Sequence, residues 1–279
     1  PRLLLSDVSK TLKPKIQCLM DLGLSGSDLV SVITRDTTIV DRGLVTRLKP
    51  VIDSLRRALG SNENVVKSIK RVPWLLSYGA HLNTETNLLL LRNFGLTDER
   101  IRKLVLAYPN YLTQKPARNK YLLHRLENDF RISRDSPLFH YGFQVLSSQN
   151  KSALDRKIGI FKSFGFSDGD VLQMFRGLPH SLGLSEVRIE QKLNFFMKEL
   201  GLGPAFMASH PAILSYSLEK RVVPRMQVLK ILDEKKVERR LWHLYSVVSL
   251  SETKFIKWFV QPYKDQIPDL YEPLKKAVA

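Results

Sequence analysis

Apolar residues recur at helical spacing along this 279-residue chain, and the pattern predicts a series of amphipathic helices. Two stretches show the i, i+3, i+4, i+7 spacing most clearly: Ile101, Leu104, Val105 and Tyr108, and Val171, Met174, Phe175 and Leu178. Each stretch gives a helix one apolar face. Such a face has to be buried against a neighbouring element.

Glycines mark a repeat in these helical stretches. They stand at positions 23, 60, 95, 165 and 201, so the steps are 37, 35, 70 and 36 residues. The step of 70 equals two repeats of 35, which places a missing marker near residue 130, where Arg131 in "FRIS" replaces the glycine. A fixed period of this size predicts stacked helical units, none of which buries its apolar face alone.

Polar residues and prolines give each repeat the same internal plan. Helix-capping side chains follow the glycines: Ser25, Ser61, Thr97 and Ser167, with Asp28 and Asp170 as capping-box carboxylates. A proline with a leucine three residues later ends the first helix: Pro73 with Leu76, Pro109 with Leu112, Pro179 with Leu182, and Pro211 with Leu214. A second helix then runs to the next glycine; one example carries Ile189, Leu193, Phe196 and Leu200 before Gly201. Each repeat is therefore predicted to be a helix, a corner and a second helix.

Two repeats and the C-terminal segment depart from this plan. Thr37 replaces the proline of the first repeat, and the repeat near Phe130 lacks both markers, so both repeats are expected to be distorted. From Asp233 the chain leaves the pattern, and "LSETKFIKWFV" (250–260) predicts a helix capped by Ser251 that seals the end of the array or binds a protein partner. We predict one all-α domain, a superhelical α-solenoid over residues 1–279, with repeats at roughly 15–232 and a cap at 233–279.

The charge of the chain indicates an acidic partner. Lys and Arg number 44 against 27 Asp and Glu, a net charge of +17. The excess is spread along the chain, with 23 basic and 13 acidic residues in 1–140 and 21 and 14 in 141–279. This distribution favours an extended basic surface over a basic tail.

Basic residues also follow the repeat. Nine or ten residues beyond each corner lie Arg47, Arg118, Arg188, Lys220 and Arg221, and slightly further on lie Lys49, Lys120, Lys192 and Arg225. The second repeat breaks the series with Leu82 and Asn83. Equivalent positions in a solenoid share one edge, so these cations are expected to contact a phosphate backbone. Arg188, Arg221 and Arg225 are the candidates for reading bases, because a guanidinium can bridge two acceptors of guanine.

Aromatic side chains offer a second kind of contact, by stacking on unpaired bases. The candidates are Tyr111, Tyr141, Phe143, Tyr216 and Trp242, for which packing in the core is the alternative.

The motifs resemble one known family. Tetratricopeptide repeats require Trp, Leu-Gly and Tyr at set offsets that are absent, and pentatricopeptide repeats lack the Pro-x-x-Leu corner. The corner motif, "SYSLEKRVVPRMQVLKIL" (215–232) and "FKSFGFSDGDVLQMFRGLPHSLGL" (161–184) resemble the mitochondrial transcription termination factor (mTERF) family, in particular its plant branch. The resemblance extends from about Leu12 to Tyr271. It implies a basic groove that binds nucleic acid in mitochondria or chloroplasts, on double-stranded DNA in transcription or on RNA in splicing and maturation.

Other functional classes lack support in the sequence. There is no phosphate-binding Gly-x-x-x-x-Gly-Lys loop, no His-Glu-x-x-His and no Cys pair, and "SDGD" (167–170) is explained as a helix cap. The six His share no repeat position, so we expect neither an enzyme nor a cofactor or metal. The single Cys18 indicates a reducing compartment, and no apolar run approaches a membrane span.

Three hypotheses follow: a regulator of organellar transcription on duplex DNA, an RNA-binding factor, and a protein-interaction scaffold. We expect the protein to act as a monomer, with any transit peptide lying outside this sequence, which begins at Pro1 without Met.

Overall fold

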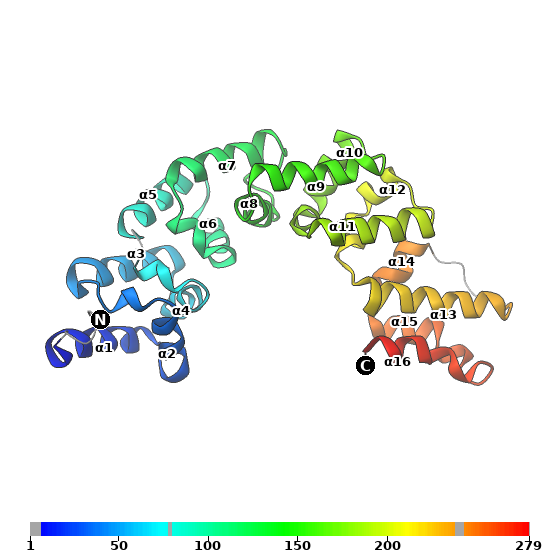
Figure 1. The fold of residues 1–279 in the computed structure, drawn as a ribbon, viewed down its shortest axis with the longest axis horizontal. Helices are drawn as coiled ribbons and strands as arrows, with labels where there is room; N and C mark the ends of the chain where they lie inside the picture. The colour runs from blue at the N-terminus through cyan, green and yellow to red at the C-terminus, as the bar shows by residue number, and fades with distance from the viewer. Residues whose placement is uncertain (1–6, 78–79, 238–242, 279) are drawn as a thin grey trace. The chain divides into compact units, whose positions relative to one another are not determined.

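The computed structural model describes residues 7–77, 80–237 and 243–278, and within these residues every regular element is helical. The all-α class predicted from the sequence is confirmed. The repeat pattern predicts one continuous domain. In the structure the chain divides into two compact units, 1–149 and 150–279. Each unit is built from consecutive helix pairs (Figure 1).

The helices occur in the predicted order within each repeat. First helices are α2 (Gly26–Arg35), α4 (Asn62–Arg71), α6 (Asp98–Ala107), α8 (Phe139–Ser147), α10 (Asp168–Gly177) and α12 (Pro204–Ser209). Second helices are α1 (Lys13–Leu22), α3 (Lys49–Leu59), α5 (Ala80–Asn93), α7 (Pro116–Asn128), α9 (Lys151–Ser163), α11 (Glu186–Leu193) and α13 (Val223–Glu234). The C-terminal helices are α14 (Leu244–Ser249), α15 (Glu252–Phe259) and α16 (Glu272–Val278).

Short helical turns complete the repeats. Five corners are 3₁₀ turns: η3 (Thr37–Ile39), η5 (Pro73–Leu76), η6 (Pro109–Thr113), η7 (Pro179–Gly183) and η9 (Pro211–Ser215). Between α8 and α9, a stretch that the structure describes in full and where the sequence lacks the proline, the chain forms no 3₁₀ turn. Wider π turns precede or extend several second helices: η2 (Val8–Leu12), η4 (Leu44–Leu48), η8 (Asn194–Glu199) and η10 (Leu218–Val222). Two further 3₁₀ turns, η11 (Gln261–Tyr263) and η12 (Pro268–Tyr271), lie near the C-terminus.

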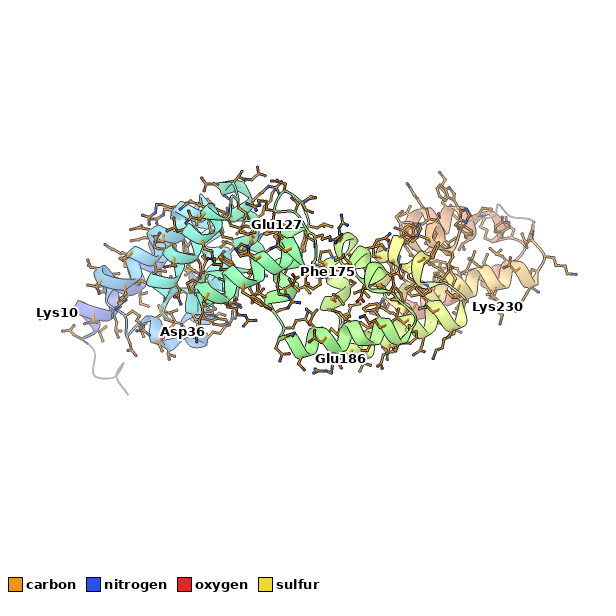
Figure 2. All side chains as sticks on the ribbon, turned by 90° about the horizontal axis from the view of Figure 1, so that it is seen from above. Lys10, Asp36, Glu127, Phe175, Glu186 and Lys230 are labelled. Carbon is orange, nitrogen blue, oxygen red and sulfur yellow. The ribbon has the colours of Figure 1, made fainter. Side chains whose placement is uncertain are left out.

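The corner leucines lie in the core, as the sequence predicts. Leu76 is 1% exposed, and Leu112, Leu182 and Leu214 are fully buried. Phe175 on α10 is also fully buried, whereas Lys230 on α13 is exposed at the surface (Figure 2). The proline ends the first helix and the leucine fixes the resulting turn in the core.

The corner of the first repeat forms without proline, and its predicted distortion is not observed. Asp36 caps the 3₁₀ turn because its carboxylate accepts hydrogen bonds from the Thr38 amide at 3.1 Å and the Thr38 hydroxyl at 2.6 Å. Ser77 donates a further hydrogen bond to this carboxylate. A capping carboxylate therefore replaces the conformational restriction of proline.

The predicted helix caps are confirmed in part. Ser61 and Thr97 cap α4 and α6, and Ser167 forms a full capping box with Asp170 at the start of α10. Ser25 makes no side-chain cap. The capping-box role of Asp28 is wrong, because this carboxylate instead pairs with Lys70 Nζ of the next repeat at 2.7 Å.

Left-handed backbone conformations mark the end of each second helix. The five predicted glycines have φ from +70° to +112°, and Arg131 and Lys236 adopt φ of +51° and +50°. Arg131 thus occupies the expected position of the missing glycine. Lys236 lies 35 residues after Gly201, so the repeat register continues beyond the predicted end at residue 232.

We expect Arg131→Gly to stabilise the protein by about 0.5–1 kcal/mol, because glycine adopts positive φ without the steric cost that a Cβ atom imposes. The Arg131 side chain is exposed, so its loss removes little packing. Urea denaturation checks the result. Arg131→Ala is the matched control, since it removes the same side chain but keeps the Cβ, and an equal gain in that variant would contradict the explanation.

The C-terminal helices pack on α13. Ser251 caps α15, as predicted, by accepting a hydrogen bond from the Lys254 amide at 3.3 Å. Phe255 and Phe259 are buried in a cluster with Val228 and Leu232 of α13, and Trp258 remains 38% exposed. This segment extends the core of the second unit to residue 274.

Candidate nucleic-acid interface

Six of the nine predicted cations lie exposed at the starts of second helices. They are Arg47, Lys49, Arg118, Lys120, Arg188 and Lys220. Arg118, Arg188 and Lys220 each occupy the third residue of α7, α11 and η10, so three repeats present a cation at the same position. Arg47 is the fourth residue of η4, also within the first turn.

Helix stability does not explain this placement. The N-terminus of a helix carries partial positive charge, so a cation in the first turn costs roughly 0.3–1 kcal/mol instead of stabilising the helix. Arg118 does donate one hydrogen bond, from Nη2 to the carbonyl of Ser147 at 3.1 Å. The remaining donors and the helix dipole of these turns are suited to an external anion.

The six cations do not all share one side of their helices. Lys120 follows Arg118 by two residues, which is about 200° of rotation in an α-helix. Lys49 stands in the same relation to Arg47. The sequence count treated both pairs as one stripe, but helical rotation places the two members of each pair on different sides.

Lys192 lies inside the protein, in contrast to its predicted surface position. It is 8% exposed, and Nζ donates a hydrogen bond to the carbonyl of Tyr216. Burial lowers the pKa of the Lys192 ammonium group. Lys192 is one helical turn beyond Arg188, where the corner of the next repeat covers it.

Arg225 is also internal, which corrects the prediction that it reads bases. Its side chain is 0% exposed, and Nη1 donates to the carbonyls of Val247 at 2.9 Å, Val248 at 3.1 Å and Leu250 at 2.7 Å. Nη2 pairs with Glu252 at 2.8 Å. Burial lowers the pKa of the guanidinium, and the hydrogen bond to Glu252 acts in the opposite direction.

Arg221 supports the same corner from a half-buried position. Nε donates to the carbonyl of Val248 at 2.9 Å, and Nη2 donates to that of Ser249 at 3.2 Å. The guanidinium also lies 4.5 Å from the ring centre of Tyr216. Among the three arginines predicted to read bases, Arg188 alone is exposed.

These internal donors define a recurring carbonyl-binding position in the second helices, where one side chain bonds the carbonyls of the next corner. Five side chains occupy it. Lys15 donates to the carbonyl of Val40, Asn87 to those of Tyr111, Leu112 and Gln114, Lys157 to that of Leu182, Lys192 to that of Tyr216, and Arg225 to those of Val247, Val248 and Leu250. The carbonyls at the end of a corner lack partners within the turn, so a donor from the preceding repeat satisfies them. Part of the basic excess is therefore structural.

The sequence analysis missed one cation at the surface position. Lys254 is exposed and is the third residue of α15, after the capping Ser251, as Lys220 is after Ser217. The repeat was taken to end at residue 232, which hid this equivalence. The serine cap followed three residues later by a cation is the signal that could have found it.

Two of the five aromatic candidates belong to the core. Tyr111 and Phe143 are fully buried with ring centres 5.1 Å apart, and Tyr216 lies next to Arg221. Tyr141 is 37% exposed, and Trp242 lies outside the described residues.

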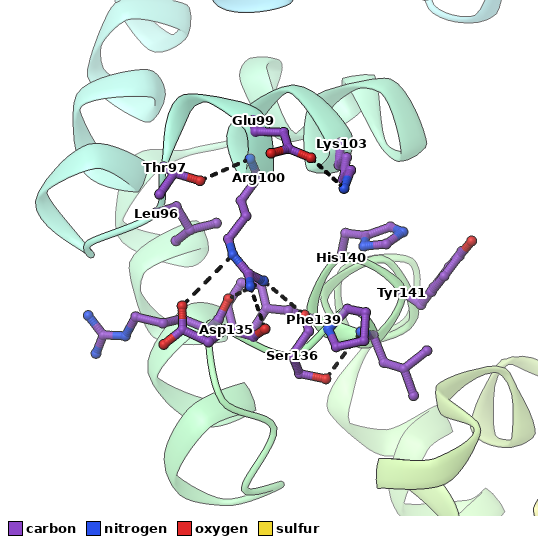
Figure 3. A pocket seen from close by; sticks show the side chains of 13 residues that line it. Leu96, Thr97, Glu99, Arg100, Lys103, Asp135, Ser136, Phe139, His140 and Tyr141 are labelled. Carbon is purple, nitrogen blue, oxygen red and sulfur yellow. Dashed lines mark hydrogen bonds and ion pairs between the residues drawn. The ribbon is translucent and has the colours of Figure 1, made fainter.

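A pocket of about 600 Å³ opens in the first unit, between the start of α6 and the irregular segment before α8. Arg100 crosses it and donates to the carbonyls of Arg134 at 3.0 Å, Asp135, and Ser136 at 3.2 Å (Figure 3). Lys103 in the same wall pairs with Glu99 at 2.7 Å. These contacts fix the irregular segment before α8 to α6, in the repeat that lacks both glycine and proline. The polar side chains of the pocket therefore have a structural role.

A smaller pocket of about 270 Å³ lies in the second unit, among α11, η9 and η10. Arg188, Gln191 and Lys192 line it from α11, and Tyr216 and Glu219 line it from the next repeat. It therefore lies directly at the predicted basic surface.

Residues 7–77, 80–237 and 243–278 contain no cluster of three or more His, Cys, Asp or Glu that could hold a metal ion. None of the helices in these ranges has the length and apolar character needed to cross a bilayer.

The repeated helix–corner–helix units define the class of α-helical repeat proteins, here with cations exposed at the starts of several second helices. Residues 42–256 match the model of the mTERF family, which is most of the chain. The protein belongs to the mTERF family, as the sequence motifs predicted.

Relatives from Arabidopsis thaliana have similar sequences. The chloroplastic transcription termination factor MTERF8 is 25% identical over 238 residues, which cover 71% of this chain and 47% of that protein. The mitochondrial transcription termination factor MTERF15 is 22% identical over 254 residues, 91% of this chain and 48% of that protein. The chain thus spans about half the length of these two relatives.

Proposed function

We propose that this protein is an organellar regulator that binds double-stranded DNA and controls transcription at termination or initiation. Proteins of the mTERF family are nucleic-acid-binding factors, not known enzymes, and the proposal contains no catalytic step. The names of its relatives, transcription termination factors of chloroplasts or mitochondria, support the process and the compartment. Because the chain spans about half of those proteins, its role in transcription rests on this proposal.

One observation carries the proposal: equivalent first turns of five repeats, at η4, α7, α11, η10 and α15, present exposed cations. Arg118, Arg188, Lys220 and Lys254 are the third residues of their elements, and Arg47 lies in the first turn of η4. A repeated cation suits a polymer with repeated negative charge, and duplex DNA is such a polymer. An incidental surface charge would have no reason to recur at one position of the repeat.

We predict that affinity for duplex DNA falls steeply with salt. Five phosphate contacts at about 0.9 counterions each give a slope near −4.5 in a plot of log K against log salt concentration. Contacts from Lys49 and Lys120 would bring the slope to about −6. Fluorescence anisotropy with a labelled random-sequence duplex, between about 50 and 200 mM salt, measures it.

The same titration separates the competing hypotheses. A flat salt response would contradict nucleic-acid binding and favour a protein-interaction scaffold. A single strand of the same sequence and a structured intron RNA, measured at one salt concentration, test the choice of polymer. Tighter binding to the RNA than to the duplex would replace transcription with splicing or RNA maturation as the function.

A further inference from the structure

The pocket of about 270 Å³ in the second unit combines a donor and an acceptor at the proposed DNA-binding surface. Arg188 projects from the first turn of α11, and Glu219 lies in η10 of the next repeat. Both residues are exposed, and both line the pocket. An acidic side chain at this place is unexpected for a surface that binds only phosphate.

Glu219 is held as an ionised carboxylate. Its own backbone amide and the Ser217 hydroxyl, which donates to Oε2 at 3.1 Å, keep the pKa of this carboxyl below its usual value. The charges of Lys192 and Arg188 act in the same direction. Glu219 therefore accepts hydrogen bonds and does not donate them at neutral pH.

A fixed carboxylate changes what the pocket can bind. It repels a phosphate group placed beside it, even though Arg188 attracts one. It attracts an amino group, and the edges of cytosine and adenine carry amino groups in the major groove. The guanidinium of Arg188 suits the O6 and N7 acceptors of guanine. A guanidinium and a carboxylate that line one pocket match the two halves of one G·C pair.

Lys192 fixes the geometry between these two residues. Its buried ammonium group on α11 bonds the carbonyl of Tyr216, at the corner that leads into Glu219. The two walls of the pocket belong to consecutive repeats, and this bond joins them. Lys192 is thus a positioning residue without contact to DNA.

We propose that Arg188 and Glu219 together read one G·C pair in the major groove. Arg188 donates to O6 and N7 of the guanine, and Glu219 accepts from the N4 amino group of the cytosine. This inference rests on the proposed binding of duplex DNA, and it assigns a sequence preference that phosphate contacts alone do not give. Arg188 contacts a phosphate on random-sequence duplexes, as counted in the salt slope, and turns to the guanine at the preferred sequence.

The experiment measures base preference separately from total affinity. Wild-type protein first selects from a pool of random duplexes, and affinity is then measured for every single base-pair substitution in the enriched sequence. Glu219→Gln and Glu219→Ala are compared with Glu190→Gln, which removes the same charge from an exposed site on α11 that does not line the pocket.

We expect the preference for G·C at one position to fall by about fivefold or more in both Glu219 variants, because a lost base contact costs roughly 1–3 kcal/mol. Glu190→Gln should raise affinity for all sequences slightly and leave the preference unchanged.

Several results would overturn the inference. One is duplex binding without any enriched sequence, and another is a G·C preference that survives in Glu219→Ala. A third is a uniform gain in affinity from Glu219→Gln much larger than that from Glu190→Gln, which would identify the pocket as a phosphate site. An effect of Glu219 on unpaired cytosine but not on duplexes would also overturn it. The absence of duplex binding in the wild type would instead contradict the proposed function.

Discussion

Replacing Arg47, Arg188 and Lys220 together by glutamate is expected to lower the affinity for duplex DNA by about a hundredfold or more at physiological salt. Three of the five proposed phosphate contacts are lost and three repulsive charges take their place. The salt slope should shrink from near −4.5 to about −2, since each lost contact removes about 0.9. Fluorescence anisotropy across a salt series measures both quantities.

The three positions allow this change without disturbing the fold. Their side chains are exposed and make no side-chain hydrogen bond or ion pair in the described structure, in contrast to Arg221 and Arg225. The matched control is Lys67→Glu, Arg176→Glu and Lys264→Glu, which alters net charge equally at exposed sites outside the first turns of second helices. Equal losses in both triple variants would reduce the effect to net charge and contradict the proposed interface.

Replacing Arg225 by methionine is expected to lower the free energy of unfolding of the second unit by about 3–5 kcal/mol. The change removes the donors to Val247, Val248 and Leu250 and leaves those carbonyls without their partner in the core. It also leaves Glu252 unpaired, although this carboxylate is half exposed and adds less. Urea denaturation followed by circular dichroism gives the loss.

Two further variants make the Arg225 experiment specific. Lys230→Met alters an exposed lysine on the same helix, whose ion pair with Glu234 spans 3.8 Å, and it should cost less than about 0.5 kcal/mol. Arg225→Lys keeps the charge but offers a shorter single ammonium group, so an intermediate loss is expected. A cost below about 1 kcal/mol for Arg225→Met would mean that water satisfies the corner carbonyls.

Much of the fold was accessible from the sequence because it depends on local chemistry. Apolar spacing located the helices, prolines located the corners, and Ser167 with Asp170 located a capping box that the structure confirms. The corner at Thr37 was misjudged because the carboxylate of the residue directly before the turn does what proline does elsewhere. The absence of proline at Thr37 was taken to distort the corner, although the capping carboxylate of Asp36 compensates for it.

The sequence by itself determined that cations recur with the repeat, and exposure at Arg118, Arg188 and Lys220 follows from their place in the first helical turn. Only the tertiary structure decided that Lys192 and Arg225 are internal. Their carbonyl partners come from the next repeat, 22 to 25 residues away. Lys192 lies seven residues after the cap Ser185, whereas Arg225 lies eight residues after the cap Ser217. The difference arises because the π turn of η10 accommodates one extra residue. A count along the chain cannot separate a surface cation from an internal one when helix winding and the next corner together decide which side chain is covered.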